Sequence, residues 1–346
     1  MDQQYYVGLD VSLETTSICV VDQSGAIIWR GKCSTEPEAI SQTVRTHAPS
    51  AVRVGLETGQ MSNWLTLQLH KHGLPVVCLD ARHAKGALSM QLNKTDANDA
   101  HGLAEVVRTG WFREVAIKSM DAQALRMLLM ARAQLVSQRQ AVANNIRGLL
   151  KTFGFVIARG SKGPFAVRVR EVIADNATLA VIIEPLLLAW QAIREQVDAL
   201  DRQVNLRAKT DAAARRLMTV PGVGVIVALA YTAVIDNPNR FKRGTSVGAY
   251  LGLTPRRYQS GEVDKAGSIS KCGDGLLRSY LFEAANVLLS RHPRSCKLKT
   301  WGLALAKRIG TRRAKVAVAR KLAIVMHRVW KDDCDFNWGD APAAAA

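Results

Sequence analysis

Four acidic residues have types and spacing suited to binding hard cations. Asp10 and Glu57 each follow a Val-Gly-Leu run, and Asp96 and Asp99 stand three residues apart, so that they share one face of a helix. Carboxylates gathered at about 4 Å repel one another by several kcal/mol even at a moderate effective dielectric. Such a cluster persists only with cations, and its oxygen ligands fit Mg²⁺, two ions of which stabilise attacking and leaving oxygens in phosphoryl transfer.

Each acid also has a structural explanation of its own. Asp10 ends a predicted strand and is suited to a turn, Glu57 is suited to a solvated loop, and Asp96 is suited to the first turn of a helix, where the dipole favours negative charge. Only the four acids taken together favour a metal site over these structural roles, and whether they lie together depends on the order of the strands.

The first 110 residues alternate short strands and helices. Three strands come first, and helix, strand, helix, strand and helix follow. The expected strands are Tyr5–Val11, Thr16–Asp22, Ala26–Lys32, Ala51–Glu57 and Pro75–Asp80, and the expected helices are Pro37–His47, Trp64–His72 and Thr95–Arg108, with Thr95 or Asn93 as a cap. This order predicts an α/β ribonuclease-H-like fold, although other α/β folds share it. In that fold the strands of Asp10 and Glu57 are neighbours.

The rest of the chain is predicted to be mostly helical. Amphipathic helices over Asp121–Leu150 and Ile183–Arg207, joined through an exposed loop at Arg159–Pro164, favour an antiparallel coiled-coil pair. A last helix is expected over Arg312–Trp330. We therefore expect a nuclease domain over 1–115, coiled-coil helices over 116–210, a helical C-terminal domain over 211–335 and a disordered tail over 336–346.

Charge is unevenly distributed along the chain. Of 47 Lys and Arg and 29 Asp and Glu, residues 1–110 hold 9 and 11, which leaves 38 and 18, a balance of +20, for residues 111–346. Such an excess indicates a polyanionic partner, in the first place nucleic acid. No apolar run approaches the ~18 residues of a membrane span, the start lacks the features of a signal peptide, and the six scattered cysteines indicate a reducing cytoplasm.

Two C-terminal motifs suggest phosphate contact. Val220-Pro221-Gly222-Val223-Gly224 resembles a helix-hairpin-helix turn, in which Gly222 and Gly224 let the backbone approach a phosphate, although a tight helix–helix turn explains it nearly as well. The second motif, Gly252 to Gly261, is expected to be a loop. Its basic residues and those that follow it, namely Arg256, Arg257, Lys265, Lys271 and Arg278, are candidates for nucleic-acid binding. Ser260 lies in this loop, but its residue type alone does not select it over Ser268 or Ser270 as a nucleophile.

Together these motifs resemble the DEDD transposases of bacterial insertion sequences, the family described as bridge-RNA-guided recombinases. The resemblance covers nearly the whole chain. It rests on Gly8-Leu9-Asp10, Glu57-Thr58-Gly59, Lys94-Thr95-Asp96-Ala97-Asn98-Asp99-Ala100, Pro221-Gly222-Val223-Gly224 and Gly252 to Gly261.

The resemblance implies a RuvC-like domain in which Asp10, Glu57, Asp96 and Asp99 hold Mg²⁺, and a Ser260 that attacks a DNA phosphate to form a phosphoserine link. It also implies a composite site in a dimer or tetramer, a structured bridge RNA that pairs with donor and target DNA, and action in the bacterial cytoplasm at the nucleoid. Two alternatives stay open: a RuvC-like junction resolvase or nuclease that uses water, and a non-catalytic nucleic-acid-binding protein.

Overall fold

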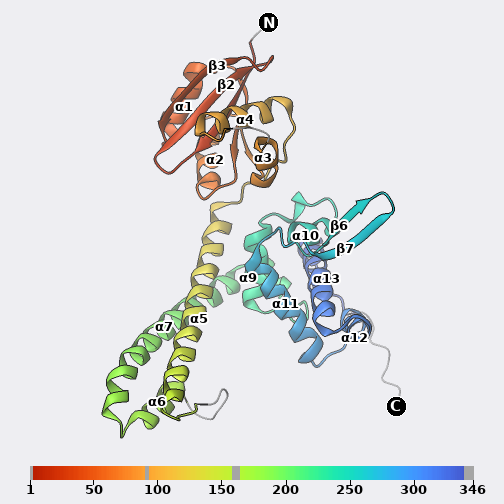
Figure 1. Ribbon diagram of the computed structural model, residues 1–346. Coiled ribbons are helices and arrows are strands. Elements are labelled where there is room, and N and C mark those ends of the chain that lie inside the picture. Colours follow the sequence, from red (N-terminus) through yellow and green to blue (C-terminus); the bar gives the residue numbers. More distant parts are fainter. Residues whose placement is uncertain (1–2, 90–92, 158–163, 339–346) are drawn as a thin grey trace. The chain divides into compact units, whose positions relative to one another are not determined.

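The computed structural model describes residues 3–89, 93–157 and 164–338 of the chain. It divides into two compact units, Met1–Met120 and Asp121–Ala346, which are described separately (Figure 1). The first is a mixed α/β sheet domain and the second is mostly helical, and both features agree with the fold class predicted from the sequence.

The first unit is built on a five-stranded sheet in the order β3-β2-β1-β4-β5. The strands are β1 (Tyr5–Val11), β2 (Thr15–Asp22), β3 (Ile27–Ser34), β4 (Ala51–Glu57) and β5 (Val76–Leu79). The first three form an antiparallel meander, whereas β1, β4 and β5 pair in parallel. The predicted neighbourhood of the Asp10 and Glu57 strands, β1 and β4, is thereby confirmed.

Helices cover both faces of this sheet. They are α1 (Pro37–His47), α2 (Ser62–Lys71), α3 (Ala81–Leu88) and α4 (Asp96–Thr109). Side chains alternate across a strand, so Val7 and Leu9 pack with α1 and α2, while Cys19 and Val21 of β2 pack against α4. The sheet therefore has an α1/α2 face and an α4 face, and the residues that share the parity of Gly8 point toward α4.

Two glycines allow α4 to lie directly on the sheet. A Cβ atom at Gly8 would stand 2.0 Å from the carbonyl oxygen of Ala100, and one at Gly55 would stand 2.4 Å from Cγ1 of Val107. No side chain fits at these distances, because real Cβ contacts are longer. Each Val-Gly-Leu run thus combines apolar residues for the α1/α2 face with a glycine for the α4 face.

Long helices form the first part of the second unit: α5 (Met120–Thr152), α6 (Phe165–Ile173) and α7 (Ala177–Thr210). The α5 and α7 helices run antiparallel, because Asp121 pairs with Arg207 and Arg132 pairs with Asp201. At the far end their apolar side chains share one cluster with α6, a helix that the sequence did not predict. The predicted exposed loop falls almost wholly on residues 158–163, which lie outside the described residues.

A second helical body follows, with α8 (Ala212–Leu217), α9 (Val225–Ile235), a 3₁₀ turn at Pro238–Arg240, α10 (Gly244–Tyr250), α11 (Gly275–Ser290), α12 (Lys297–Ile309) and α13 (Thr311–Lys331). Its core surrounds α9, in which every residue from Val227 to Ile235 is buried. The hydroxyl of Tyr231 donates to the carbonyl of Ala323 at 2.7 Å, which satisfies a polar group inside this core.

Two expectations need correction. Residues 255–269 form a two-stranded hairpin, β6 (Pro255–Ser260) and β7 (Val263–Ile269), where a loop was predicted (Figure 1). Phe336 and Trp338 pack against the helical core, so the predicted disordered tail does not begin at 336; residues 339–346 lie outside the described residues. Among the described helices, α7 is long and apolar enough by length and composition alone to cross a membrane, a test that core helices of soluble proteins also pass.

Candidate active site

Asp10 and Glu57 are placed side by side by strand register. Leu9 pairs with Leu56 in the parallel ladder of β1 and β4, so the next residue in each strand is a carboxylate. Both acids share the parity of the glycines two residues before them, which places them on the α4 face. The sheet therefore presents two acids at the carboxyl ends of neighbouring strands.

The N-terminus of α4 supplies the other two acids. Thr95 is the N-cap, as one of the two predicted choices, and its hydroxyl accepts a hydrogen bond from the backbone N–H of Asn98 at 3.2 Å. Asp96 is the first residue of the helix and Asp99 follows three residues later. Both lie in the first turn, where the helix dipole favours negative charge.

The pKa values of Asp10 and Glu57 are raised by burial and by electrostatic repulsion from neighbouring carboxylates. Burial, followed by the charges of Asp99, Asp96 and Glu57, raises the pKa of Asp10 from 3.8 to about 6, while Lys94 opposes the rise. Burial raises the pKa of Glu57 as well, and Asp99 adds to it. The charges of the other three predicted acids therefore act on Asp10, which is the most strongly perturbed of the four.

Asp96 differs from the other three acids. Its carboxylate accepts a hydrogen bond from Nζ of Lys32 on β3 at 2.9 Å, and this contact holds the pKa of Asp96 below its usual value. Both side chains are more than half exposed. No sequence pattern pointed to Lys32, because only the tertiary fold brings the end of β3 next to the start of α4.

The chemistry of the acids fits a hard divalent cation. Their carboxylate oxygens are the donors that Mg²⁺ prefers, and a cation would relieve the repulsion that adds to burial in raising the pKa of Asp10. Across the described residues, no group of three or more His, Cys, Asp or Glu side chains is already arranged around a metal position. Asp96 is held by Lys32, and Asp10, Glu57 and Asp99 do not form such a group without it, so side chains of the cluster would have to turn to bind a metal ion together.

Ser260 lies at the tip of the β6–β7 hairpin. It is the last residue of β6 and pairs with Val263, the first residue of β7, across a two-residue turn. Gly261 opens that turn with φ +55°, a conformation that favours glycine. All six residues of β6 are exposed, so the serine hydroxyl is open to a large substrate.

The candidate cations near Ser260 have different surroundings. Arg257 binds Asp264 across the hairpin, with Nε donating to Oδ1 at 2.8 Å. Arg256 donates to the carbonyl of Ser270 at 3.3 Å. Lys265 stands opposite Tyr258 in the ladder, and in the described part of the chain no carboxylate lies within ion-pair distance of it.

The remaining candidates are placed mainly by packing. Arg278 donates to the carbonyl oxygens of Leu251 and Gly273 at 3.2 and 2.6 Å, and Lys271 takes a positive φ of 56° in the same connection. A Cβ at Gly222 would stand 2.5 Å from the carbonyl of Ala284 on α11, so the packing of two backbones explains this glycine, whereas Gly224 has open space around it. Phosphate contact by these residues remains a prediction.

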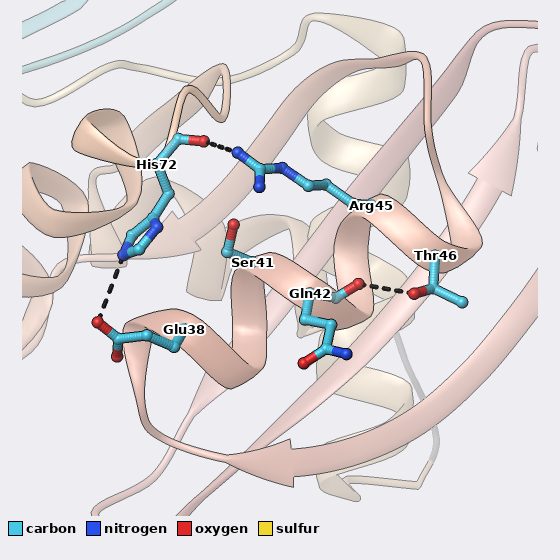
Figure 2. A pocket seen from close by; sticks show the side chains of 6 residues that line it. All are labelled: Glu38, Ser41, Gln42, Arg45, Thr46 and His72. Carbon is cyan, nitrogen blue, oxygen red and sulfur yellow. Dashed lines mark hydrogen bonds and ion pairs between the residues drawn. The ribbon is translucent and has the colours of Figure 1, made fainter.

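A shallow pocket of about 470 Å³ lies on α1 beside the end of α2 (Figure 2). Inside it, Glu38 approaches Nε2 of His72 at 3.5 Å, and Arg45 donates to the carbonyl of His72. The side chain of Ser41 is buried there, and its hydroxyl has no hydrogen-bond partner within the described residues. Because α1 and α2 cover the face opposite α4, this pocket is separate from the carboxylates.

Comparison with known proteins finds matches along most of the chain. A DEDD transposase model of the IS110 type, described as "Transposase", matches residues 7–155, and a model described as "Transposase IS116/IS110/IS902 family" matches residues 214–299. The chain is 31% identical to a "Probable family 20 transposase" of Pseudomonas aeruginosa over 92% of this chain and 95% of the relative. It is 29% identical to the "Transposase for insertion sequence element IS1111A" of Coxiella burnetii, over 92% and 88% of the two chains.

Proposed function

This chain belongs to the IS116/IS110/IS902 family of insertion-sequence transposases, which cleave and join DNA, and from this premise we propose its chemistry. It recombines insertion-sequence DNA, with four carboxylates holding Mg²⁺ and Ser260 acting as the nucleophile. The DEDD type of its first domain itself suggests the use of a divalent metal. The observation that carries the proposal is the register of β1 and β4, in which Leu9 pairs with Leu56 and Asp10 and Glu57 follow side by side on the face that α4 covers.

The carboxylates position the reacting phosphate. Asp10 and Glu57 stand on the rigid end of the sheet and Asp99 on the first turn of a helix packed against it, so their relative positions are fixed before substrate arrives. When bound, Mg²⁺ supplies charge stabilisation for the attacking and leaving oxygens. Asp96 completes the set after it leaves Lys32.

Ser260 provides the covalent step. Its Oγ forms a bond to phosphorus as the bond from phosphorus to one deoxyribose oxygen breaks. The serine proton passes to a base or to solvent, and the departing deoxyribose oxygen takes up a proton to become a free hydroxyl. Attack by a hydroxyl of the exchanged strand on the phosphoserine reverses these bond changes and joins the new strand. Phosphodiester bonds are conserved throughout, so no nucleotide cofactor is consumed.

Partners of the chain are inferred from its charge and its family resemblance. The balance of +20 over residues 111–346 supports contact with nucleic acid, because phosphate binding releases condensed counterions. We propose that a structured bridge RNA pairs with donor and target DNA. Protomers of a dimer or tetramer act together in the bacterial cytoplasm, each with a nuclease region over 1–115, assembly helices over 116–210 and a serine region over 211–335.

Denaturing electrophoresis with labelled DNA tests this function. The protein is purified with the RNA that accompanies it and is incubated in Mg²⁺ with DNA that carries the junction of the element's ends. Wild type should form a covalent protein–DNA adduct. Ser260→Ala should bind both nucleic acids and form none, while Ser268→Ala, with a serine on the same hairpin, serves as the matched control.

Two outcomes would overturn parts of the proposal. An adduct formed by Ser260→Ala would assign the nucleophile to another residue. Cleavage by wild type in Mg²⁺ without any adduct would favour hydrolysis by a RuvC-like resolvase.

A further inference from the structure

The register of the β6–β7 hairpin divides its residues between two faces. Tyr258 pairs with Lys265 and Ser260 pairs with Val263, and all four share one face because directly paired residues point the same way. We call this the serine face. Gln259 pairs with Asp264 on the opposite face, which Arg257 also joins by strand alternation.

The opposite face is closed by its own ion pair. The Arg257 guanidinium donates to both oxygens of Asp264, from Nε to Oδ1 at 2.8 Å and from a terminal nitrogen to Oδ2. Two parallel hydrogen bonds of this kind fix the relative geometry of the two strands. The charge of Arg257 is therefore largely neutralised by Asp264 within the hairpin.

The side chains of the serine face are exposed, and Lys265 among them has no ion-pair partner in the described parts of the chain. Tyr258 is 65% exposed and Val263 is 42% exposed, although both residue types usually gain from burial. Lys265 has no carboxylate within ion-pair distance in the described parts of the chain, and the serine face itself includes no acid. An aromatic ring and a free ammonium group thus flank the serine hydroxyl on an exposed ribbon.

We propose that Tyr258 stacks on the base next to the phosphate that Ser260 attacks, while Lys265 contacts the adjacent backbone phosphate. The inference rests on the proposed function and names a substrate-contacting residue for it. Side chains two residues apart on a strand lie about 7 Å apart, so Tyr258 is close enough to Ser260 to hold the nucleotide beside the reacting phosphate. A ring combined with a cation is the usual means of binding a single strand, since every base has a face that can stack.

Charge identifies the occupant as a DNA strand. A protein partner would have to place a carboxylate on Lys265, whereas a nucleic-acid strand presents a phosphate to the cation and a base to the ring together. The bond that Ser260 breaks is itself in DNA, so the substrate necessarily reaches this face. Stacking then orients the phosphate toward the serine hydroxyl.

The test measures the rate of adduct formation by the full chain with its copurified RNA and the junction DNA. Tyr258→Ala should slow it about 10- to 100-fold, the factor for the loss of one base–aromatic stack. Tyr258→Phe should retain wild-type rates because it keeps the ring. Gln259→Ala, next to Tyr258 but on the opposite face, should match wild type.

An abasic sugar beside the cleaved phosphate gives the second measurement. It should slow wild type as much as Tyr258→Ala does and should slow Tyr258→Ala little further, because both changes remove the same stack. Additive effects, or a Tyr258→Ala rate within twofold of wild type, would overturn this inference while the serine nucleophile stands. Absence of any wild-type adduct would overturn both.

Discussion

The two regions to which we assign the chemistry of this transposase are built in opposite ways. The carboxylates stand on the end of a packed sheet and on a capped helix, and two glycines keep these elements in contact. Ser260 stands at the tip of a hairpin whose first strand is wholly exposed. One site is held in place by the core, and the other is presented to solvent.

This difference suits the two tasks. Acids that repel one another need a rigid support, since otherwise they would move apart and lose the geometry that a cation requires. The proposed nucleophile, Ser260, would have to reach a phosphate in a large nucleic-acid assembly and needs access instead. Mutations in the sheet should therefore change both stability and activity, whereas mutations on the hairpin should change activity alone.

The largest expected effect comes from Asp10→Asn. The amide keeps the shape of the side chain but removes the negative charge of the acid that is most affected by the other three. Loss of several kcal/mol of transition-state stabilisation should reduce DNA cleavage in Mg²⁺ by about 1000-fold or more. RNA binding, measured by filter retention, should stay within about twofold. Full cleavage by this variant would remove Asp10 from the metal site.

The sheet region was the more predictable part from sequence. Strand β1, helix α1 and strand β4 begin and end where the residue patterns placed them, because apolar alternation and turn residues act locally. Asp10 and Glu57 could be grouped because strand order in this fold places β1 beside β4, and Asp96 could be grouped with Asp99 because residues three apart share a helix face. Helices α3 and α6 were missed, since short helices of eight and nine residues show little more than two turns of periodicity.

The hairpin region was less predictable. Pro255 and Gly261 indicate a loop when they are read as single residues, yet Pro255 opens a strand and Gly261 forms the turn that reverses it. The pairing of Arg257 with Asp264, and of Asp96 with Lys32, depends on register and tertiary packing. No local pattern specifies such contacts. The different hydrogen-bond partners of Arg256 and Arg257 were therefore not predicted.

Substitution at Gly8 tests the rigid side of the comparison. Gly8→Ala places a Cβ 2.0 Å from the Ala100 carbonyl, so α4 must shift. Overpacking of this kind costs about 1–3 kcal/mol and should lower the melting temperature in calorimetry by several degrees. Gly86→Ala, where the added Cβ meets nothing within 4 Å, is the matched control. Equal melting of both variants would show that α4 does not rest on the sheet as described.

The repulsion among the acids should appear as a pH-dependent stability. The pKa of Asp10 is raised to about 6 in the fold, above its unfolded value near 3.8, so its contribution to stability is present at low pH and is lost as the pH rises through about 6. In EDTA, Asp10→Asn should therefore melt above wild type at pH 7.5, by about 2–4 °C, and by about half as much at pH 5, which lies midway between the two pKa values.

Calorimetry at both pH values, with Mg²⁺ as a third condition, checks this expectation. Added metal should stabilise wild type more than the variant, because only the wild-type cluster has its full charge. A variant that melts below wild type at pH 7.5 in EDTA would mean that Asp10 gains more from its surroundings than it loses by repulsion.

The smallest expected effect concerns Lys32, an exposed residue of β3 that contacts Asp96 at the start of α4. Its Nζ lies 2.9 Å from Asp96, where it competes with a metal ion for that carboxylate. Lys32→Met should reduce the Mg²⁺ concentration needed for half-maximal cleavage a few-fold. Its melting temperature without metal should hardly change, because exposed ion pairs contribute only about 0–1 kcal/mol. Lys71→Met, at the end of α2 beyond the opposite sheet face, should leave the Mg²⁺ requirement unchanged. A raised Mg²⁺ requirement in Lys32→Met would instead mean that Lys32 holds Asp96 ready for the metal.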